Sequence, residues 1–320
     1  MSGTLNIKNL LFSADTWNSR AHCVREKRMF PIIGIVVVLG CIAGGYLMEK
    51  GNLLVLMQPA ELLIIGGAAV GTVLIGNPPH ILKSIAMGML GVFKGSRYTA
   101  SVYLDTLRFL NDFFGTARKG GLTSLEQDLD APDKSALFKR HPNFAHDHEA
   151  MLFFCDTMRT LLAGGVEVHD LDSVMEADLE ILHKQNRMPA GALSTMADSL
   201  PGLGIVAAVL GVVITMGSLG GPPEEIGHKV AAALVGTFLG ILLCYGFLGP
   251  IAANLKKQCD AEGDYFGCLR QAMLAYMKGI SPILALEAAR RVIPPHVRPT
   301  FQEMDKACRK SAAAPAEAAA

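Results

Sequence analysis

Hydrophobic and polar positions fall into blocks along this chain. Four long stretches carry almost no charge: about 30–48, 53–76, 200–221 and 230–253. Each is long enough for the roughly 20 helical residues that cross a bilayer. Lipid offers no hydrogen bonds to a backbone, so each stretch is predicted to form a transmembrane helix.

The segments between these stretches have a different, amphipathic pattern. Between Tyr98 and Lys119, apolar residues recur at spacings of three and four, which predicts a helix with one buried face. Arg118 to Gly121 is typical of a helix end, and Thr123 to Glu126 fits a capping box that opens a short helix. Further helices are expected at 147–162, at 169–187 and from the fourth stretch to Lys278, and we find no strand pattern.

The joins between the stretches predict a topology. Stretches one and two are separated by four residues, and stretches three and four by the short loop PPEEIGHK, so both pairs should be antiparallel hairpins. Lys and Arg flank the other ends, which places those ends and both termini in the cytoplasm. We therefore expect an all-α membrane protein with four transmembrane helices, a helical cytoplasmic domain between helices 2 and 3, and a helical cytoplasmic C-terminal tail. The predicted parts are an N-terminal extension (1–28), transmembrane helices 1–2 (29–77), the cytoplasmic domain (78–198), transmembrane helices 3–4 (199–253), C-terminal helices (254–310) and a disordered alanine-rich tail (311–320).

Composition excludes several classes of function. Hydrophobic residues make up 51% of the chain, mean hydropathy is +0.34, and the formal net charge of zero gives no attraction to nucleic acid. Seven scattered cysteines without a CxxC pair indicate free thiols. His146 and His148 would diverge on a helix, so no metal site is expected. Without a phosphate loop or a nucleophile constellation, we expect neither an enzyme nor a bound cofactor.

Glu61 is the only Asp, Glu, Lys, Arg or His within the four stretches. A carboxylate at the bilayer centre costs about 2.5–3.5 kcal/mol, but Glu61 lies near the outer end of its stretch. A structural or positioning role and a role in ion relay both remain open.

The third and fourth stretches hold the other candidate features. Pro201 and Pro250 lie at nearly equal separations from a loop midpoint near Glu225, so we expect them at one depth, either as ordinary helix punctuation or as a hinge in both helices. Small residues at spacings of three and four allow close helix contact, within this chain or against a partner: Gly204, Ala208, Gly211, Ala232, Gly236 and Gly240. The Thr237 hydroxyl either bonds back to its own helix or faces an ion path, and neither it nor the Tyr245 hydroxyl carries charge at neutral pH. These two stretches contain no Asp, Glu, Lys, Arg or His, so if protons or sodium move along them, the titrating carboxylate must come from another chain.

Segments in all four stretches resemble the MotA family of flagellar stator subunits, over about residues 29–310. They are FPIIGIVVVLGCIAGGYLM, QPAELLIIGGAAVGTVLIGN, SLPGLGIVAAVLGVV and AALVGTFLGILLCYGFLGP. The resemblance implies a ring of five subunits around two MotB chains, with MotB supplying the membrane aspartate and a grip on peptidoglycan. Ion passage would turn the ring in the bacterial inner membrane and push the rotor protein FliG. Residues 1–28 fall outside the family pattern.

The resemblance also assigns roles by position. Arg118 and Glu126, which the residues alone explain as a helix end and a cap, match the family's rotor-contact charges. Pro201 and Pro250 match the prolines that couple ion flow to conformation, and Ala208 stands where sodium-driven relatives tend to have threonine, which favours protons. The expected wall of the ion path consists of Ala208, Gly236, Thr237, Gly240 and Tyr245.

Two alternatives remain at this stage. The related ExbB/TolQ class energises envelope transport, but its members typically have three spans and an outside N-terminus. A membrane scaffold without a channel would only recruit cytoplasmic proteins. A pulldown with MotB-like, ExbD-like or TolR-like partners separates the first alternative, and a proton-flux assay separates the second.

Overall fold

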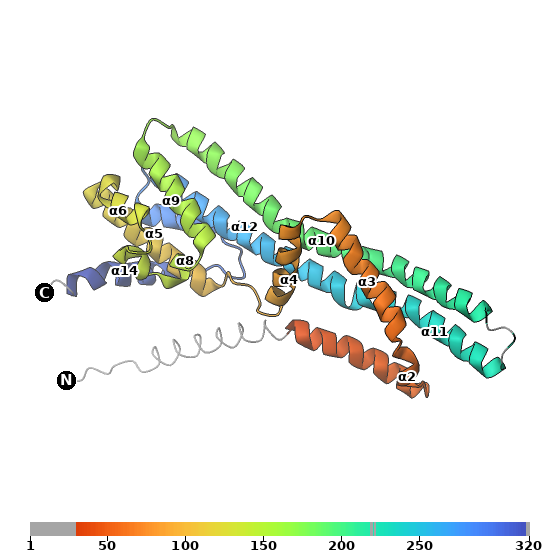
Figure 1. The fold of residues 1–320 in the computed structure, drawn as a ribbon. Coiled ribbons are helices and arrows are strands. Elements are labelled where there is room, and N and C mark those ends of the chain that lie inside the picture. The colour runs from red at the N-terminus through yellow and green to blue at the C-terminus, as the bar shows by residue number, and fades with distance from the viewer. Residues whose placement is uncertain (1–29, 218–219, 221, 318–320) are drawn as a thin grey trace, which may run out of the picture. The chain divides into compact units, whose positions relative to one another are not determined.

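The computed structural model describes residues 30–217, 220 and 222–317; the predicted N-terminal extension lies outside them. Within these ranges the chain is helical and has no β-strand, which confirms the predicted fold class (Figure 1). In chain order the helices are Phe30–Met48, α2 (Leu53–Leu56), α3 (Pro59–Gly76), α4 (Pro79–Val92), α5 (Ala100–Gly120), η1 (Leu122–Leu125), α6 (Glu126–Asp130), α7 (Ala136–Lys139), α8 (Pro142–Ala145), α9 (His148–Ala163), α10 (Val168–Met216), α11 (Pro223–Ile241), η2 (Leu242–Leu248), α12 (Gly249–Met277), α13 (Pro282–Val292) and α14 (Phe301–Glu317).

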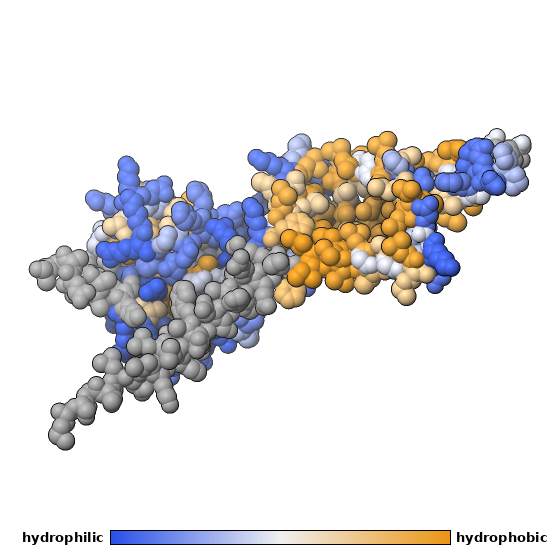
Figure 2. Space-filling view, turned by 90° about the horizontal axis from the view of Figure 1, so that it is seen from below, coloured by the Kyte–Doolittle hydropathy of each residue, from blue (hydrophilic) through white to orange (hydrophobic). Residues whose placement is uncertain are grey.

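Four helical segments of the described chain are long and apolar enough to cross a membrane. They are Phe30–Met48, Leu53–Gly76, and parts of Val168–Met216 and Pro223–Met277. Each contains all or most of one of the four apolar stretches, so the predicted number and order of spans agree with the structure. Hydrophobic side chains gather over the part of the surface that these helices form, while hydrophilic residues cover the rest (Figure 2).

The chain divides into two compact units, and the first combines the described residues up to Gly95 with residues 186–258. In this unit, α3 presents one buried face with four-residue spacing, formed by Glu61, Ile65, Ala69 and Val73. Ile65 and Ala69 pack with residues of α10 and η2, namely Ala197, Leu200, Ala207 and Cys244. A second apolar cluster joins α4 to α10 and α12 through Ile81, Ile85, Val92, Leu193 and Leu255.

The second unit combines residues 96–185 with 259–320 and has an aromatic core around α5. Phe109 stacks on Phe144 with ring centroids 4.2 Å apart, and Phe113 meets Phe154 edge-on at 4.8 Å. The hydroxyls of Thr106 and Tyr265 are hydrogen-bonded at 2.7 Å inside this core. The buried face predicted for this helix is therefore present and is richer in phenylalanine than the leucine spacing indicated.

α10 joins two helices that the sequence predicted separately. The helix expected at 169–187 continues without a break into the third apolar stretch, through Pro189 and Pro201. Proline inside a helix removes one backbone hydrogen bond and favours a kink, but it does not force the helix to end. The helix end predicted near Arg187 is therefore absent from the structure.

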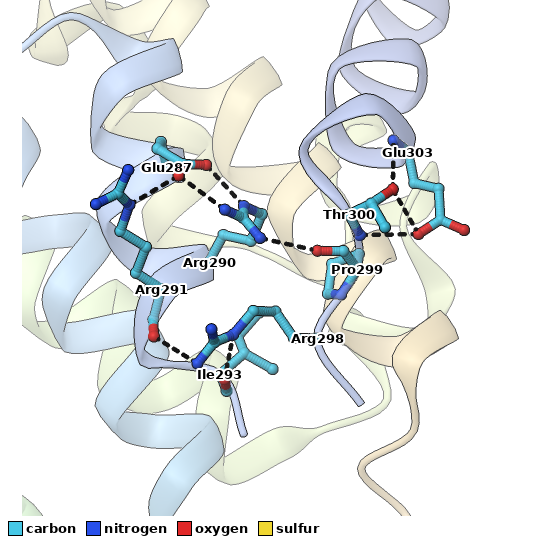
Figure 3. Close-up of polar contacts among 8 residues, drawn as sticks. All are labelled: Glu287, Arg290, Arg291, Ile293, Arg298, Pro299, Thr300 and Glu303. Carbon is cyan, nitrogen blue, oxygen red and sulfur yellow. Dashed lines mark hydrogen bonds and ion pairs between the residues drawn. The ribbon is translucent and has the colours of Figure 1, made fainter. Parts of the chain in front are cut away.

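The corner between α13 and α14 is held by arginine side chains (Figure 3). Glu287 accepts hydrogen bonds from Nε of both Arg290 and Arg291, at 2.7 and 2.8 Å. The charge-assisted bond from Arg290 holds the pKa of Glu287 at about 2. Arg298 donates to the backbone oxygen of Ile293 at 2.7 Å, which fixes the loop before α14.

A capping box opens α14. The backbone N–H of Thr300 donates to Oε2 of Glu303 at 2.8 Å, and the N–H of Glu303 donates to the Thr300 hydroxyl at 3.2 Å (Figure 3). α14 then runs to Glu317, so residues 311–317 are helical and the predicted disordered tail is wrong for them. The alanines responsible for that prediction are also the strongest helix formers.

Candidate functional site

Glu61 lies in the first turn of α3, two residues after Pro59, at which the helix begins. Its exposed fraction is only 8%. Within the described residues its Oε2 atom is fully enclosed and has no hydrogen-bond partner. A buried polar atom without a partner is uncommon in proteins, and it marks this position for closer attention.

Gly236 of α11 makes room for this carboxyl group. A Cβ atom placed on Gly236 would lie 2.6 Å from Oε2 of Glu61, and 3.3 Å from both Cβ of Ala207 and the backbone nitrogen of Ala208. Any side chain at 236 would therefore displace the carboxyl group or push α11 away from α10. The structure thus places Glu61 against Gly236, a member of the predicted ion-path wall that the sequence did not connect with it, and the Ala208 backbone approaches the same glycine.

Helices α10 and α11 pack closely against each other along a line of small residues, which we call the α10–α11 seam. A Cβ on Gly240 would lie 2.6 Å from the Leu200 carbonyl oxygen and 2.9 Å from Cα of Gly204, while one on Gly211 would lie 2.7 Å from Cβ of Ala233. Here the two backbones touch, as small-residue spacing in membrane helices permits. Gly204, Gly211, Gly236 and Gly240 therefore pack inside this chain, which is one of the two roles that the sequence left open.

The remaining wall residues differ in exposure. Thr237 is partly buried, and its Cα lies 3.4 Å from the position of a Cβ on Gly204. Thr72 and Thr215 bond back to their own helices at 2.8 Å, whereas no partner for the Thr237 hydroxyl exists within the described chain. Tyr245 is 73% exposed. These two hydroxyls therefore remain available to a partner.

Pro201 and Pro250 do not lie at one depth, so that prediction is wrong. The contacts of Gly204 with Gly240, and of Gly211 with Ala233, make the antiparallel pairing symmetric about residue 222 rather than Glu225. Pro201 then lies opposite position 243, seven residues before Pro250, or about 10 Å along a helix. The predicted loop PPEEIGHK begins α11 at Pro223, because proline at N1 and two acidic residues in the first turn favour a helix start.

A π-helical segment, η2, separates α11 from α12 and was not predicted. Its last bond runs from the Gly249 backbone N–H to the Cys244 carbonyl oxygen. A Cβ on Gly249 would lie 2.9 Å from that oxygen. Such segments are uncommon and often occur at functional sites. The sequence could not predict a π-helical segment here. One extra residue in a turn changes the periodicity of apolar positions only where polar residues alternate with them, and a membrane helix is apolar on all sides.

Arg118 and Glu126 belong to the second unit, and both are exposed. Arg118 stands in the last turn of α5, and Gly121 with φ 77° follows the helix as predicted. In the described chain neither residue forms an ion pair. The capping box predicted here is wrong: residues 122–125 form a 3₁₀ turn without a side-chain cap, and the Ser124 hydroxyl donates to the Gly121 carbonyl oxygen at 2.7 Å.

His141 forms a buried cluster that the sequence did not reveal. Its Nε2 lies 3.2 Å from Oδ2 of Asp112, and its Nδ1 lies 3.5 Å from Oδ1 of Asp105. Burial lowers the pKa of His141, but the two carboxylates outweigh that effect and raise it above its ordinary value. Asp105 and Asp112 are seven residues apart and share a face of α5, but nothing in the pattern indicated which residue would meet them. The described residues offer no group of three or more His, Cys, Asp or Glu that could hold a metal ion.

Comparison with known proteins gives consistent matches. Residues 32–121 match the model of the motility protein A N-terminal region, and residues 145–266 match the MotA/TolQ/ExbB proton channel family. The chain is similar to the chemotaxis protein LafT of Vibrio parahaemolyticus and to motility protein A of Escherichia coli. Each is 36% identical over 278 residues, which is 87% of this chain and 98% or 94% of the relative.

Two solved structures have the same fold. A chain of the Campylobacter jejuni MotAB structure matches with a TM-score of 0.69 and 20% identity, over 83% of this chain and 96% of that one. A chain of the Bacillus subtilis flagellar MotAB stator complex matches with a TM-score of 0.64 and 22% identity, over 80% and 92%. At these identities the likeness concerns the fold.

Proposed function

This chain belongs to the motility protein A family, and we propose that it is a subunit of a flagellar stator that conducts protons and converts their flow into torque. The match of both family models, on a chain with four membrane-length helices in the family order, is the observation that carries this proposal. It is a multi-pass protein of the bacterial inner membrane. The match of residues 32–121 to the N-terminal motility protein A model favours this function over ExbB/TolQ-like transport.

A MotB-like partner would complete the ion path. Stretches 200–221 and 230–253 contain no acidic or basic residue, so the partner must supply the membrane aspartate. Two related folds come from MotAB complexes, which supports this partner. The side chain of Ala208 is a methyl group without an oxygen, and this favours protons because sodium binds through oxygen ligands. We expect five copies around the partner, with both termini in the cytoplasm.

The rotor contact would come from Arg118 and Glu126. Both side chains are exposed, so their charges are available to an oppositely charged surface on FliG. The prolines 201 and 250 would transmit movement between the ion path and this contact. Because they lie at different depths, they would act as two separate points of flexibility in α10 and α12.

Complementation tests the function. The chain is expressed with its MotB-like partner in a strain deleted for its own stator genes, and swimming speed is followed while sodium is varied and an uncoupler is then added. We expect swimming that ignores sodium and stops with the uncoupler. Sodium dependence would contradict the proton assignment, and no swimming with an assembled complex would contradict the stator function.

Arg118→Asp tests the rotor contact. We expect it to abolish swimming while membrane insertion and assembly with the partner persist, because an exposed charge at a helix end contributes only about 0.3–1 kcal/mol to stability. Arg140→Asp is the matched control, since Arg140 is also an exposed arginine of the second unit. Poor accumulation of Arg118→Asp would support a structural role, and equal loss in both variants would indicate a general charge effect.

A further inference from the structure

Glu61 is nine-tenths buried, and within the described chain its enclosed Oε2 atom has no hydrogen-bond partner. An ionised carboxylate in such a place would lose its hydration without gaining a hydrogen bond or a counter-charge. In practice a group so placed becomes neutral. A carboxylic acid at Glu61, which keeps its proton, is therefore the form that fits between α3 and the α10–α11 seam.

The helices around Glu61 offer no charge that would change this conclusion. Along α10 the ionisable residue before the seam is Asp198, and none follows it up to Met216. On α11 the charged residues stand at the outer end of the helix, where Lys229 pairs with Glu225 at 2.8 Å. Glu224 and His228 belong to the same end of the helix, and α2 carries no ionisable residue. Inside the seam, Gly236 and Ala207 present only backbone and a methyl group.

We infer that Glu61 is a positioning residue whose proton holds α3 against the seam at Gly236, and whose loss of that proton releases α3. This inference rests on the proposed function, which supplies the flow of protons. In the held state the neutral carboxyl group fills the space above Gly236. Breaking its O–H bond transfers the proton to water or to a base on the partner chain, and it leaves a charge that cannot stay in an apolar seam without a partner.

The release step would link proton movement to helix movement. Because Gly236 and Ala208 belong to the predicted ion-path wall, a change in how α3 packs on them would change the shape of that wall. Reprotonation from the other side of the path restores the packed state, so one proton is taken up and one is given off in each cycle. Glu61 then passes a proton and changes the packing in one event.

Two substitutions of Glu61 separate this role from packing alone. Glu61→Gln keeps the length and the neutral shape of the acid but cannot release a proton. Glu61→Asp is shorter but can release one. We expect Glu61→Gln to assemble with the partner and lose swimming, and Glu61→Asp to retain part of it with a changed dependence on external pH. If Gln supports swimming better than Asp, Glu61 acts by packing and the inference is wrong.

Glu49→Gln is the matched control, since Glu49 is an exposed carboxylate in the loop before α2. It should swim like the wild type. A loss equal to that of Glu61→Gln would overturn the inference, because removal of any outer charge would then suffice. If the wild-type chain itself does not restore swimming, the proposed function fails, and the next measurement still tests Glu61.

Infrared difference spectra of the assembled complex in membranes report the proton directly. Subtracting the spectrum of Glu61→Gln from that of the wild type should reveal the carbonyl stretch of a protonated carboxylic acid at neutral pH. Carboxylate bands in its place would overturn the inference whatever the swimming assay shows.

Discussion

Substituting Gly240 in α11 tests the α10–α11 seam most directly. Alanine is preferred over glycine in a helix interior by about 1 kcal/mol, so an unhindered Gly→Ala change should stabilise the protein. At position 240, however, the new Cβ would lie 2.6 Å from the Leu200 carbonyl oxygen and 2.9 Å from Cα of Gly204. Both are backbone atoms, so neither can rotate away, and the two helices must separate.

The magnitude follows from these opposing contributions. Overpacking typically destabilises a protein by about 1–3 kcal/mol. Because the new methyl group of Gly240→Ala would meet backbone atoms that cannot move aside, we expect a cost of about 3 kcal/mol. The helix preference of about 1 kcal/mol offsets part of this cost, which leaves a net loss of about 2 kcal/mol. Gly227→Ala is the control on the same helix, because nothing lies within 4 Å of its Cβ position. It should gain up to about 1 kcal/mol.

A thiol-reactive dye provides the assay. Buried Cys244, Cys259 and Cys268 react only when the protein opens, while exposed Cys41 contributes to the starting signal. In detergent, Gly240→Ala should lower the unfolding temperature and Gly227→Ala should raise it slightly. Equal shifts in the two variants would refute the reasoning, because helix preference alone would then explain both.

Two predictions concern the second unit. Thr300→Ala should lower the free energy of unfolding by about 1 kcal/mol, because it removes the cap that Thr300 shares with Glu303. The control Ser124→Ala should have little effect, because Ser124 caps no helix. Equal shifts of the dye-monitored melting temperature in the two variants would contradict the assignment of the capping box. Because the two neighbouring aspartates raise the pKa of His141, its contribution to stability should be full below about pH 6.5 and decline as pH rises through the raised value. Melting temperature against pH should therefore fall more steeply above that point for the wild type than for His141→Gln, and parallel curves would show that His141 is not the titrating group.

The sequence predicted the four spans well because lipid acts on each stretch separately. A long apolar run must form a helix in a membrane whatever its neighbours do, so 30–48 and 53–76 could be assigned from composition alone. The buried face of α5 was predictable for a similar reason, since the three-to-four spacing is a property of one helix. The local ends were harder. Thr123 to Glu126 and Thr300 to Glu303 both fit the capping pattern, but only the second forms the box, because a 3₁₀ turn occupies the first.

Contacts between stretches could not be predicted, because they depend on register. The prediction placed the turn between α10 and α11 near Glu225, whereas the contacts are symmetric about residue 222. This difference shifts every expected contact between a residue of α10 and a residue of α11 by six positions, and it explains why the two prolines were expected at one depth. The same uncertainty hid the site of Glu61. From the sequence, this carboxylate had access to the outer interface, and only its placement against Gly236 shows that it is enclosed. Helix packing alone would explain why position 236 is glycine, but the Glu61 carboxyl group provides a second reason. A methyl group at position 236 would occupy the space that this carboxyl group fills.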